Sequence, residues 1–312
     1  MDLKNRKLKR TLWIVGLIVG LFFVSVLGYG YYIYHSIKDT ARDVYKPLTE
    51  EKSKPTPLRE KMRESSKSKA INILLLGVDQ RKGDKGRSDT MIVATLNPGK
   101  SSMLMTSIPR DTRVHIDGHE GYSKINAAYA YGNEALAVKT VEDYLNIPID
   151  YYIKMNMEGL SSLVDAVGGV TVHNHLAWYD GTLKFDFKKG TLHLNGQQAL
   201  SYARERHRDP RGDFGRNDRQ REVIQAMIES GKRLTTLTKM TDILSAVGHN
   251  VQTNLSFDDM KFLVANYRQC RQNIENYEVK GNPKYLDKVS WVLVSEEERK
   301  NVHDLISKAL SD

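Results

Sequence analysis

The sequence has 312 residues, a formal net charge of +9 and a single cysteine, Cys270. One cysteine excludes an intrachain disulfide and a cysteine-rich metal site. Residues 1–69 contain 15 Lys and Arg against 7 Asp and Glu, whereas the other 243 residues contain 32 against 31, so the excess charge belongs to the N-terminal region and argues against a nucleic-acid-binding domain.

An apolar run follows a basic N-terminus. Residues 1–11 include five Lys and Arg, and residues 12–34 carry no charge. As a helix, this run is long enough to cross a hydrocarbon core of about 30 Å. The basic tail should stay in the cytoplasm, which predicts a single-pass type II membrane protein whose remaining chain is extracytoplasmic. A cleaved signal peptide is the alternative, but no convincing small-residue cleavage site follows the run.

Residues 35–69 are polar and charged, and they contain three prolines. Such a segment cannot bury enough apolar surface to fold alone. It is predicted to be an extracytoplasmic linker, either a tether or a frayed juxtamembrane helix, kept near anionic head groups by its positive charge. The domain that follows, residues 70–312, should therefore act close to the outer face of the membrane.

Strand and helix patterns mix throughout residues 70–312. The apolar run 71–78 predicts a strand buried on both faces, and strands at 90–96 and 103–108 are joined by a turn at 97–99. Further elements are predicted as a helix over 133–145, a strand at 151–155, a helix over 157–167, a strand from 170, a helix capped by Asn195, a helix with Val223 to Ile228 on its apolar side, and strands near 277–279 and 289–294. This pattern favours a single α/β domain with a mixed central sheet.

Residues 201–221 contain seven arginines and no lysine. Guanidinium groups offer paired donors that match phosphate or carboxylate, so an all-arginine set suggests anion recognition. The start of a helix at Asp213 would add its first N–H groups to Arg216 and Arg219. Four Asp and Glu side chains lie among the arginines, and they leave open a solvated helix face crossed by ion pairs.

Two further candidate positions lie at strand ends. Asp79 and Asp89 flank the loop after strand 71–78 and could share a hard cation such as Mg²⁺, although Asp is also common in turns. Arg110 follows strand 103–108 and either points into a crevice or pairs with Asp111. Ligands of open α/β sheets gather at such ends, and a metal with fixed cations is what a pyrophosphate needs.

Seven motifs occur in series: LLLGVDQR, GRSDT, SIPRDTRV, KINAAYAYG, LVDAVGGV, LNGQQALSYARER and DFGRNDRQR. Their order and spacing resemble the LytR-CpsA-Psr family of bacterial cell-wall enzymes, and within it the teichoic acid transferases of Gram-positive rods. The resemblance runs from about residue 71 to 233 and continues more weakly to 312. It implies an α-β-α sandwich with a hydrophobic tunnel for a lipid between the sheet and the helices.

The resemblance also implies an activity. Family members are phosphotransferases that move an anionic polymer, here wall teichoic acid, from a polyprenyl-pyrophosphate carrier to a peptidoglycan hydroxyl. The acceptor would be the C6 hydroxyl of N-acetylmuramic acid, and polyprenyl phosphate would leave. The expected partners are the lipid-linked polymer, the peptidoglycan and the cell membrane, with no nucleic acid.

Through its motifs, the resemblance also implies which residues of this sequence would form the site. Asp79 and Asp89 would hold Mg²⁺, or Mn²⁺ in its place. The pyrophosphate would be bound by Arg81, Arg87, Arg110, Arg204, Arg206, Arg216, Arg219 and Gln220. The catalytic candidates are Arg110, Arg206 and Arg216, with Asp213 as a metal-shell residue or general base. Arg208 and Arg211 are left unassigned, and a solvated surface suits them best.

Two alternatives stay open at the level of sequence. A lipid pyrophosphate hydrolase would use the same side chains with water as the acceptor. A non-enzymatic, membrane-tethered regulator of cell-wall genes would need contact with nucleic acid, which the charge distribution disfavours.

Overall fold

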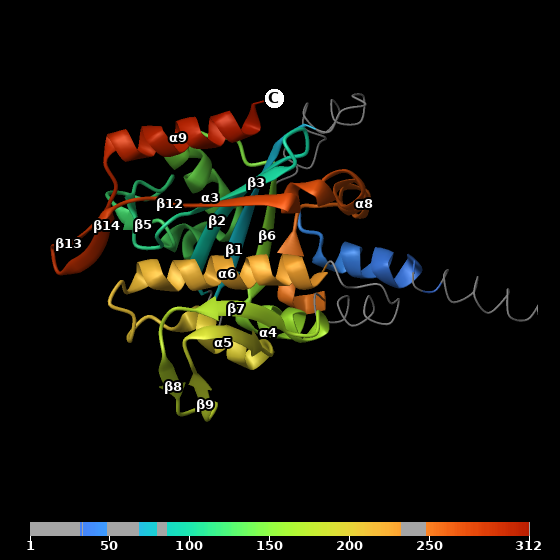
Figure 1. Ribbon diagram of the computed structural model, residues 1–312. Coiled ribbons are helices and arrows are strands. Elements are labelled where there is room, and N and C mark those ends of the chain that lie inside the picture. The colour runs from blue at the N-terminus through green and yellow to red at the C-terminus, as the bar shows by residue number, and fades with distance from the viewer. Residues whose placement is uncertain (1–31, 33, 49–68, 80–85, 232–247, 312) are drawn as a thin grey trace, which may run out of the picture.

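The computed structural model describes residues 32, 34–48, 69–79, 86–231 and 248–311 (Figure 1). The predicted cytoplasmic tail, nearly all of the predicted membrane-spanning run and much of the predicted linker lie outside these residues. Among the residues that are described, no helix is long and apolar enough to cross a membrane.

A six-stranded mixed sheet forms the centre of the molecule, in the order β11-β6-β1-β2-β3-β12. β1 (Ile71–Val78), β2 (Ser88–Asn97) and β3 (Ser102–Ser107) are antiparallel neighbours, and β6 (Tyr151–Asn156) runs parallel to β1. β11 (Val251–Thr253) pairs antiparallel with β6, and β12 (Asn273–Glu278) pairs parallel with β3. The predicted mixed sheet is confirmed, and the first predicted strand coincides with β1.

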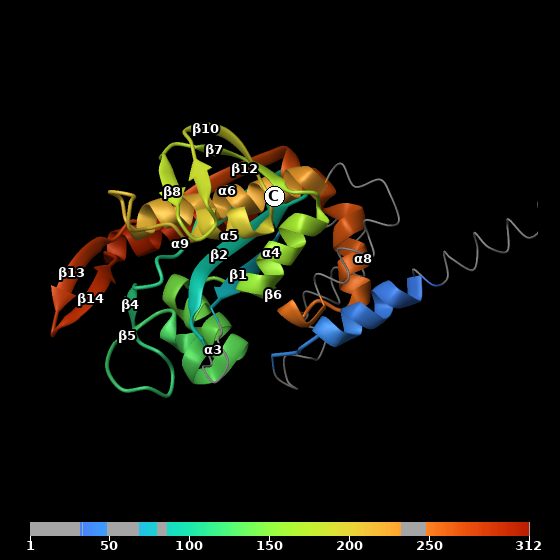
Figure 2. The same ribbon diagram turned by 90° about the horizontal axis from the view of Figure 1, so that it is seen from below.

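Helices cover both faces of this sheet. α3 (Ala127–Leu145) and α9 (Glu296–Leu310) pack on one face. α4 (Met157–Ala166), α5 (Gly196–Arg204) and α6 (Asp213–Gly231) lie over the other face, and α8 (Phe257–Asn266) packs beside β1 and β6. Figure 2 shows α3 and α6 on opposite sides of β1 and β2. The molecule therefore has the α-β-α layering that the family resemblance implied.

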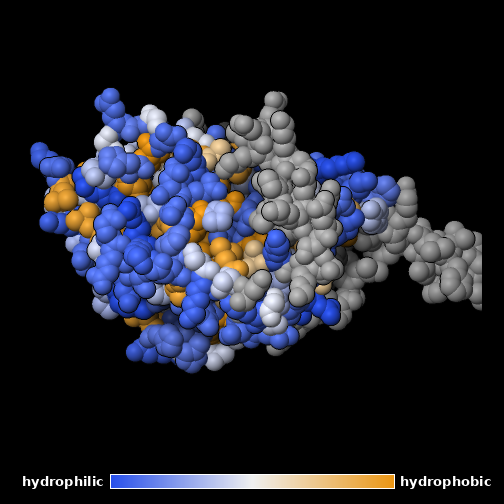
Figure 3. All heavy atoms as spheres, turned by 90° about the horizontal axis from the view of Figure 1, so that it is seen from above, coloured by the Kyte–Doolittle hydropathy of each residue, from blue (hydrophilic) through white to orange (hydrophobic). Residues whose placement is uncertain are grey.

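Four short strand pairs lie outside the central sheet: β4 (Arg113–Val114) with β5 (Ser123–Lys124), β7 (Val170–Asn174) with β10 (Gly190–Leu194), β8 (Trp178–Asp180) with β9 (Phe185–Phe187), and β13 (Asn282–Leu286) with β14 (Val289–Leu293). Two 3₁₀ turns, Gly248–Asn250 and Arg268–Gln272, complete the described elements. Hydrophilic residues cover most of the face drawn in Figure 3, and apolar residues show in its middle and at its left end, where the β13–β14 hairpin projects in Figure 1.

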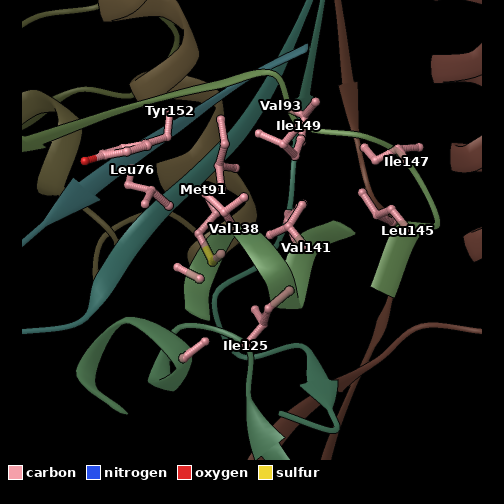
Figure 4. Packing of buried hydrophobic residues seen from close by; sticks show 14 of the residues in the cluster. Leu76, Met91, Val93, Ile125, Val138, Val141, Leu145, Ile147, Ile149 and Tyr152 are labelled. Carbon is pink, nitrogen blue, oxygen red and sulfur yellow. The ribbon is translucent and has the colours of Figure 1, made fainter. Parts of the chain in front are cut away.

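The core follows from the two-residue period of the strands. Leu76 of β1 and Met91 of β2 are buried on the face that packs against Val138 and Val141 of α3, as Figure 4 shows. Burying an aliphatic side chain of this size contributes about 1.5–3 kcal/mol. Leu75, the residue before Leu76 in β1, points to the opposite face and is only partly buried. That face carries a cavity, described below.

Two helix predictions can be compared with the structure. α3 begins at Ala127, earlier than the predicted residue 133, because the sequence pattern detected only the part after a kink at Gly132 and Asn133. The kink interrupts the helical period and conceals the first turn and a half. α5 starts as predicted, since the Asn195 side chain accepts from the Gln198 backbone N–H while Gln198 reaches back to the Asn195 backbone.

Residues 34–48, part of which falls in the predicted linker, lie against the domain. A helical segment covers residues 34–44, and Ala41 and Val44 in it are buried. Lys46 donates its backbone N–H to the Thr253 carbonyl at 2.7 Å, and its ammonium group lies 3.0 Å from the buried Glu134 carboxylate. This part of the chain is thus attached to the edge of the sheet at β11.

Candidate active site

Three arginines surround Asp213, the first residue of α6. Its Oδ2 atom lies 3.2 Å from Nε of Arg110 and 3.3 Å from Nη2 of Arg216, and its Oδ1 atom lies 4.0 Å from Nη1 of Arg206. Arg110 follows β3, Arg206 follows α5 and Arg216 lies in the first turn of α6, so the fold brings three separate segments together. We call Arg110, Arg206, Asp213 and Arg216 the arginine cluster.

Asp89 joins the arginine cluster through a β-bulge. Val78 of β1 pairs with Ser88 and Gly77 pairs with Thr90, which leaves Asp89 as the extra residue of β2. Bulges re-aim side chains and occur often beside active sites. Here the Asp89 carboxylate lies 3.0 Å from Nη1 of Arg110. The Asp89 side chain therefore faces the cluster, and it lies at the same end of the β1–β2 pair as Asp79.

Asp79 directly follows β1 and forms an ion pair with Arg204, the last residue of α5, at 3.3 Å. Its backbone N–H points to the Arg87 carbonyl at 3.4 Å, which closes the end of the β1–β2 pair. The Arg87 side chain is exposed. Arg81 lies outside the described residues, so its predicted place in the site is left as a prediction.

Arg216 is the most deeply buried cation of the cluster, with 5 % of its surface exposed. Burial, followed by the positive charge of Arg110, lowers its pKa. Within the described part of the chain, its Nε and Nη2 atoms are buried and make no hydrogen bond, although Nη2 lies near Asp213. Leaving buried donors unpaired costs free energy, so an anion that enters the cluster would be stabilised by relieving this cost.

Arg110 is in a different electrostatic situation. Burial alone would lower its pKa, but the Asp89 and Asp213 carboxylates outweigh burial, and the net shift is upward. Arg110 thus stays charged between two carboxylates. An anionic ligand could replace either carboxylate as the partner of Arg110, and a cation could replace Arg110 as the partner of either carboxylate. The cluster is held together by interactions that a substrate can exchange for its own.

An apolar cavity of about 220 Å³ opens beside the cluster, between the sheet and helices α4, α5 and α6. Its walls include Leu75 and Ile153 from the sheet and Val223, Ile224 and Met227 from α6. Arg204 and Gln220, two residues predicted to bind pyrophosphate, line the same cavity. Gln220 lies one turn after Arg216 on α6, so the cavity, whose walls are mostly apolar, ends near the arginine cluster.

Arg219, also predicted to bind pyrophosphate, is directed elsewhere. Its guanidinium is buried, lies 2.7 Å from the Asp209 carboxylate and donates to the Glu205 carbonyl. Although burial favours the neutral acid, hydrogen bonds from Arg219 and Arg211 lower the pKa of Asp209 to about 2. The structure thus uses Arg219 to fix the loop before α6 rather than to complete the arginine cluster.

Two residues near the site were missed from the sequence. Asp209 packs against Gly215, where a Cβ atom would collide with its carboxylate, and so it fixes the first turn of α6. Asn126, which precedes α3, donates from its side chain to Asp89 at 3.4 Å and from its backbone to the Arg110 carbonyl at 3.3 Å. Asn126 lies in the KINAAYAYG motif, but no rule of sequence spacing connects it to Asp89.

Arg208 and Arg211 pair with neighbouring carboxylates and are half-exposed, as the solvated-surface interpretation predicts.

The donor chemistry near Asp79 and Asp89 can be compared with the needs of a metal. No group of three or more His, Cys, Asp or Glu side chains suited to a metal occurs in the described ranges. Mg²⁺ does not require such a cage, because it is usually held by one or two carboxylates together with water and substrate phosphate. The two carboxylates at one strand end fit that kind of site.

Both the sequence and the fold of this chain match known proteins. The sequence model of the LytR_cpsA_psr family matches residues 31–308. A Bacillus cereus protein named polyisoprenyl-teichoic acid--peptidoglycan teichoic acid transferase TagU is 46% identical over 276 residues, which cover 88% of this chain and 89% of the relative. The crystal structure of B. subtilis TagU has a TM-score of 0.64 at 38% identity and covers 78% of this chain and 98% of its own. A structure described as TagT bound to LI-WTA has a TM-score of 0.66 at 30% identity, with coverages of 78% and 91%.

Proposed function

The chain belongs to the LytR_cpsA_psr family, and from this premise we propose that it transfers an anionic cell-wall polymer, wall teichoic acid, from a polyprenyl-pyrophosphate carrier to peptidoglycan. The names of its relatives support a teichoic acid transferase. The acceptor would be a glycan hydroxyl, with the C6 hydroxyl of N-acetylmuramic acid as the candidate. Polyprenyl phosphate would be released.

The observation that carries this proposal is the apolar cavity that lies near the arginine cluster. Arg204 and Gln220 line the cavity, and Arg204 pairs with Asp79 at the end of the strand that leads to the cluster. A ligand that fills both parts must have an anionic head and an apolar tail. A lipid pyrophosphate has this form, whereas a free nucleotide or sugar phosphate would leave the apolar walls uncovered.

The charges of the site favour a pyrophosphate that arrives with a cation. Four arginines, Arg110, Arg204, Arg206 and Arg216, are opposed by Asp79, Asp89 and Asp213. A divalent cation on Asp79 and Asp89 would release Arg110 and Arg204 from their carboxylates and make them available to phosphate oxygens. Mg²⁺, or Mn²⁺ in its place, would supply Lewis-acid stabilisation of the phosphate oxygens when bound.

The protein's own groups would then act mainly by position and charge. Arg110, Arg206 and Arg216 would offset the negative charge that develops on the transferring phosphoryl group. Arg206 is the most exposed of the three and is free to adjust to the ligand. Asp213, which lies within ion-pair distance of all three arginines, is the candidate to accept the proton of the attacking hydroxyl.

The direct test is a transfer assay with the full-length protein in detergent or nanodiscs. It would be given a polyprenyl-pyrophosphate-linked teichoic acid precursor, Mg²⁺ and peptidoglycan, and polymer bound to peptidoglycan would be measured. We expect transfer together with an equal amount of polyprenyl phosphate. Release of polyprenyl phosphate without polymer attached to peptidoglycan would instead identify a lipid pyrophosphate hydrolase. If neither product forms, the proposal is rejected.

The location can be tested separately. We propose an extracytoplasmic domain attached to the cell membrane, on the basis of the basic tail and the apolar run at residues 12–34. Protease added to intact protoplasts should then digest the domain. A protected domain would place the site in the cytoplasm, where its proposed acceptor is absent.

A further inference from the structure

Exposed and partly exposed aromatic side chains gather around Arg113, three residues after Arg110 of the arginine cluster. Tyr122, which is 48% exposed, stacks under the Arg113 guanidinium at 3.5 Å and against His115, with 3.9 Å between the ring centroids. Trp291 of β14 lies on another side of Arg113, with 5.8 Å between the guanidinium carbon and the ring centroid. We call Arg113, His115, Tyr122 and Trp291 the aromatic surface.

A second aromatic pair includes a residue of the same loop. His119 stacks on Tyr131 of α3, with ring centroids 4.1 Å apart, and Tyr131 is 47% exposed. Large exposed aromatic side chains gathered in one place are uncommon on a soluble domain and mark interaction sites. Alternating rings and nitrogen donors along a loop suit an extended ligand that has both apolar faces and polar edges.

Backbone hydrogen bonds attach this surface to the segment that begins with Arg110. The N–H of Ile125 donates to Thr112 at 2.8 Å, and the N–H of Val292 donates to Asp111 at 2.9 Å. The segment that begins with Arg110 is therefore held by backbone hydrogen bonds to β14 and to the residue that follows β5. Figures 1 and 2 both show them at the end of the molecule where α6 begins.

The direction of the reaction specifies what should bind there, given the proposed function. The oxygen of the acceptor hydroxyl forms a bond to the polymer-side phosphorus, and the bond from that phosphorus to the bridging oxygen breaks. The electron pair leaves with polyprenyl phosphate, and the hydroxyl proton passes to a base. Attacking and leaving oxygens lie roughly in line. Because the cavity lined by Arg204 and Gln220 would hold the leaving lipid, the acceptor must approach from the side of Arg110 that faces away from it.

We propose that the aromatic surface is the acceptor site and binds the glycan strand of peptidoglycan. Hexosamine rings have apolar C–H faces that stack on aromatic rings, while their hydroxyl and acetamido groups hydrogen-bond at the edges. Trp291 and Tyr122 provide such rings, and Arg113 and His115 provide nitrogen atoms beside them. A lipid acceptor would require a continuous apolar surface, which the charged Arg113 interrupts.

The test compares Tyr122→Ala and Trp291→Ala with Tyr285→Ala in the full-length protein. Tyr285 is 71% exposed on the same hairpin, but Trp291 pairs with Lys284, so Tyr285 points to the opposite face of the β13–β14 ribbon. We expect the first two variants to raise the KM for soluble, uncrosslinked peptidoglycan strands about tenfold each. Acceptor-independent hydrolysis of the lipid pyrophosphate should stay at the wild-type rate in all three.

A second measurement keeps the proposal independent of the transfer assay. Calorimetric titration of the same glycan strands should show binding by wild-type protein and by Tyr285→Ala, and about tenfold weaker binding by Tyr122→Ala. Unchanged KM and unchanged binding in both surface variants would overturn the acceptor site. Equal losses of transfer and hydrolysis would do so as well, since they would indicate damage to the arginine cluster. Absence of both reactions in wild-type protein would reject the proposed function, while the titration would still test the surface.

Discussion

Two groups of arginines lie around the start of α6 and differ in the carboxylates with which they pair. In the arginine cluster, Arg216 is buried with unpaired donors, and Arg110 is shared between two partly exposed carboxylates. Around Asp209, Arg219 is buried and pairs with a carboxylate that is 3 % exposed, and of its three nitrogens only Nε makes no hydrogen bond within the described residues. The first arrangement can exchange its partners for a ligand, whereas the second has its partner already.

The difference shows that residue type alone does not separate a ligand site from a scaffold. Both groups contain arginine and aspartate at similar spacing around the start of α6. The two groups differ in the solvent access of the carboxylate. Asp213 is 28 % exposed, so a ligand can replace it as the partner of the arginines, whereas Asp209 is 3 % exposed and packs against Gly215. A buried pair that loses one member leaves an uncompensated charge, which water cannot reach.

The largest effect should come from breaking the buried ion pair between Asp209 and Arg219, which we call the scaffold pair. We expect Asp209→Ala to lower the free energy of unfolding by about 3–5 kcal/mol, because Arg219 would remain buried without its partner. Urea denaturation of the full-length protein in detergent would measure this change. A loss below about 1 kcal/mol would show that the two arginine groups do not differ in the way described.

The next effect should come from the arginine cluster, and on activity rather than stability. Arg110→Ala and Arg216→Ala should each lower turnover by about 10²- to 10³-fold, because each removes a fixed stabiliser of developing charge. The free energy of unfolding of Arg216→Ala should be unchanged or higher, since a buried cation with unpaired donors is removed. Arg208→Ala, at a half-exposed position of the same stretch, is the matched control and should keep wild-type turnover. Wild-type turnover in both cluster variants would contradict the assignment.

A smaller effect is expected at the two carboxylates proposed to hold the metal. Asp79→Asn and Asp89→Asn should raise the Mg²⁺ concentration needed for half-maximal turnover by about 10- to 100-fold. Asp117→Asn, an exposed carboxylate on the loop before β5, should leave it unchanged. If all three variants respond to Mg²⁺ like the wild type, Asp79 and Asp89 do not hold the metal.

The scaffold pair should also give a pH signature. The pKa of Asp209 is lowered from 3.8 to about 2 in the folded protein, so its contribution to stability is present above about pH 4 and is lost as the pH falls towards 2. The stability difference between wild-type protein and Asp209→Asn should therefore shrink between pH 5 and pH 2. Urea titrations across this range would measure it, and a constant difference would show that the carboxylate is not the titrating group.

The smallest effect is expected where arginine is solvated. Arg211→Ala should change the free energy of unfolding by less than about 1 kcal/mol and leave turnover unchanged, because Arg211 is half-exposed and Asp209 keeps its buried partner Arg219. Thermal and urea unfolding of this variant, beside Asp209→Ala, would separate the two contributions to the same loop. A larger loss would extend the scaffold to Arg211.

The sequence by itself determined the elements and the kinds of side chain at the site. The apolar run 71–78 has the length and composition of a strand that is buried on both faces. Asn195 and Gln198 together specify a helix start within four residues. The ordered motifs indicated the family, which the comparisons confirm. These features depend on residues that are near one another in the chain, so local spacing is enough to predict them.

Only the tertiary structure decided which charges meet. Arg110 and Asp213 are 103 residues apart in the chain and 3.2 Å apart in space, and Asp89 reaches Arg110 because of a bulge that no sequence pattern announces. The tertiary structure also directed Arg219 to the buried Asp209 and Arg216 to the partly exposed Asp213, although the two arginines lie three residues apart on one helix. Ion pairing depends on the distance and solvent access that packing sets, and for that physical reason the partners of each arginine could not be assigned from the sequence.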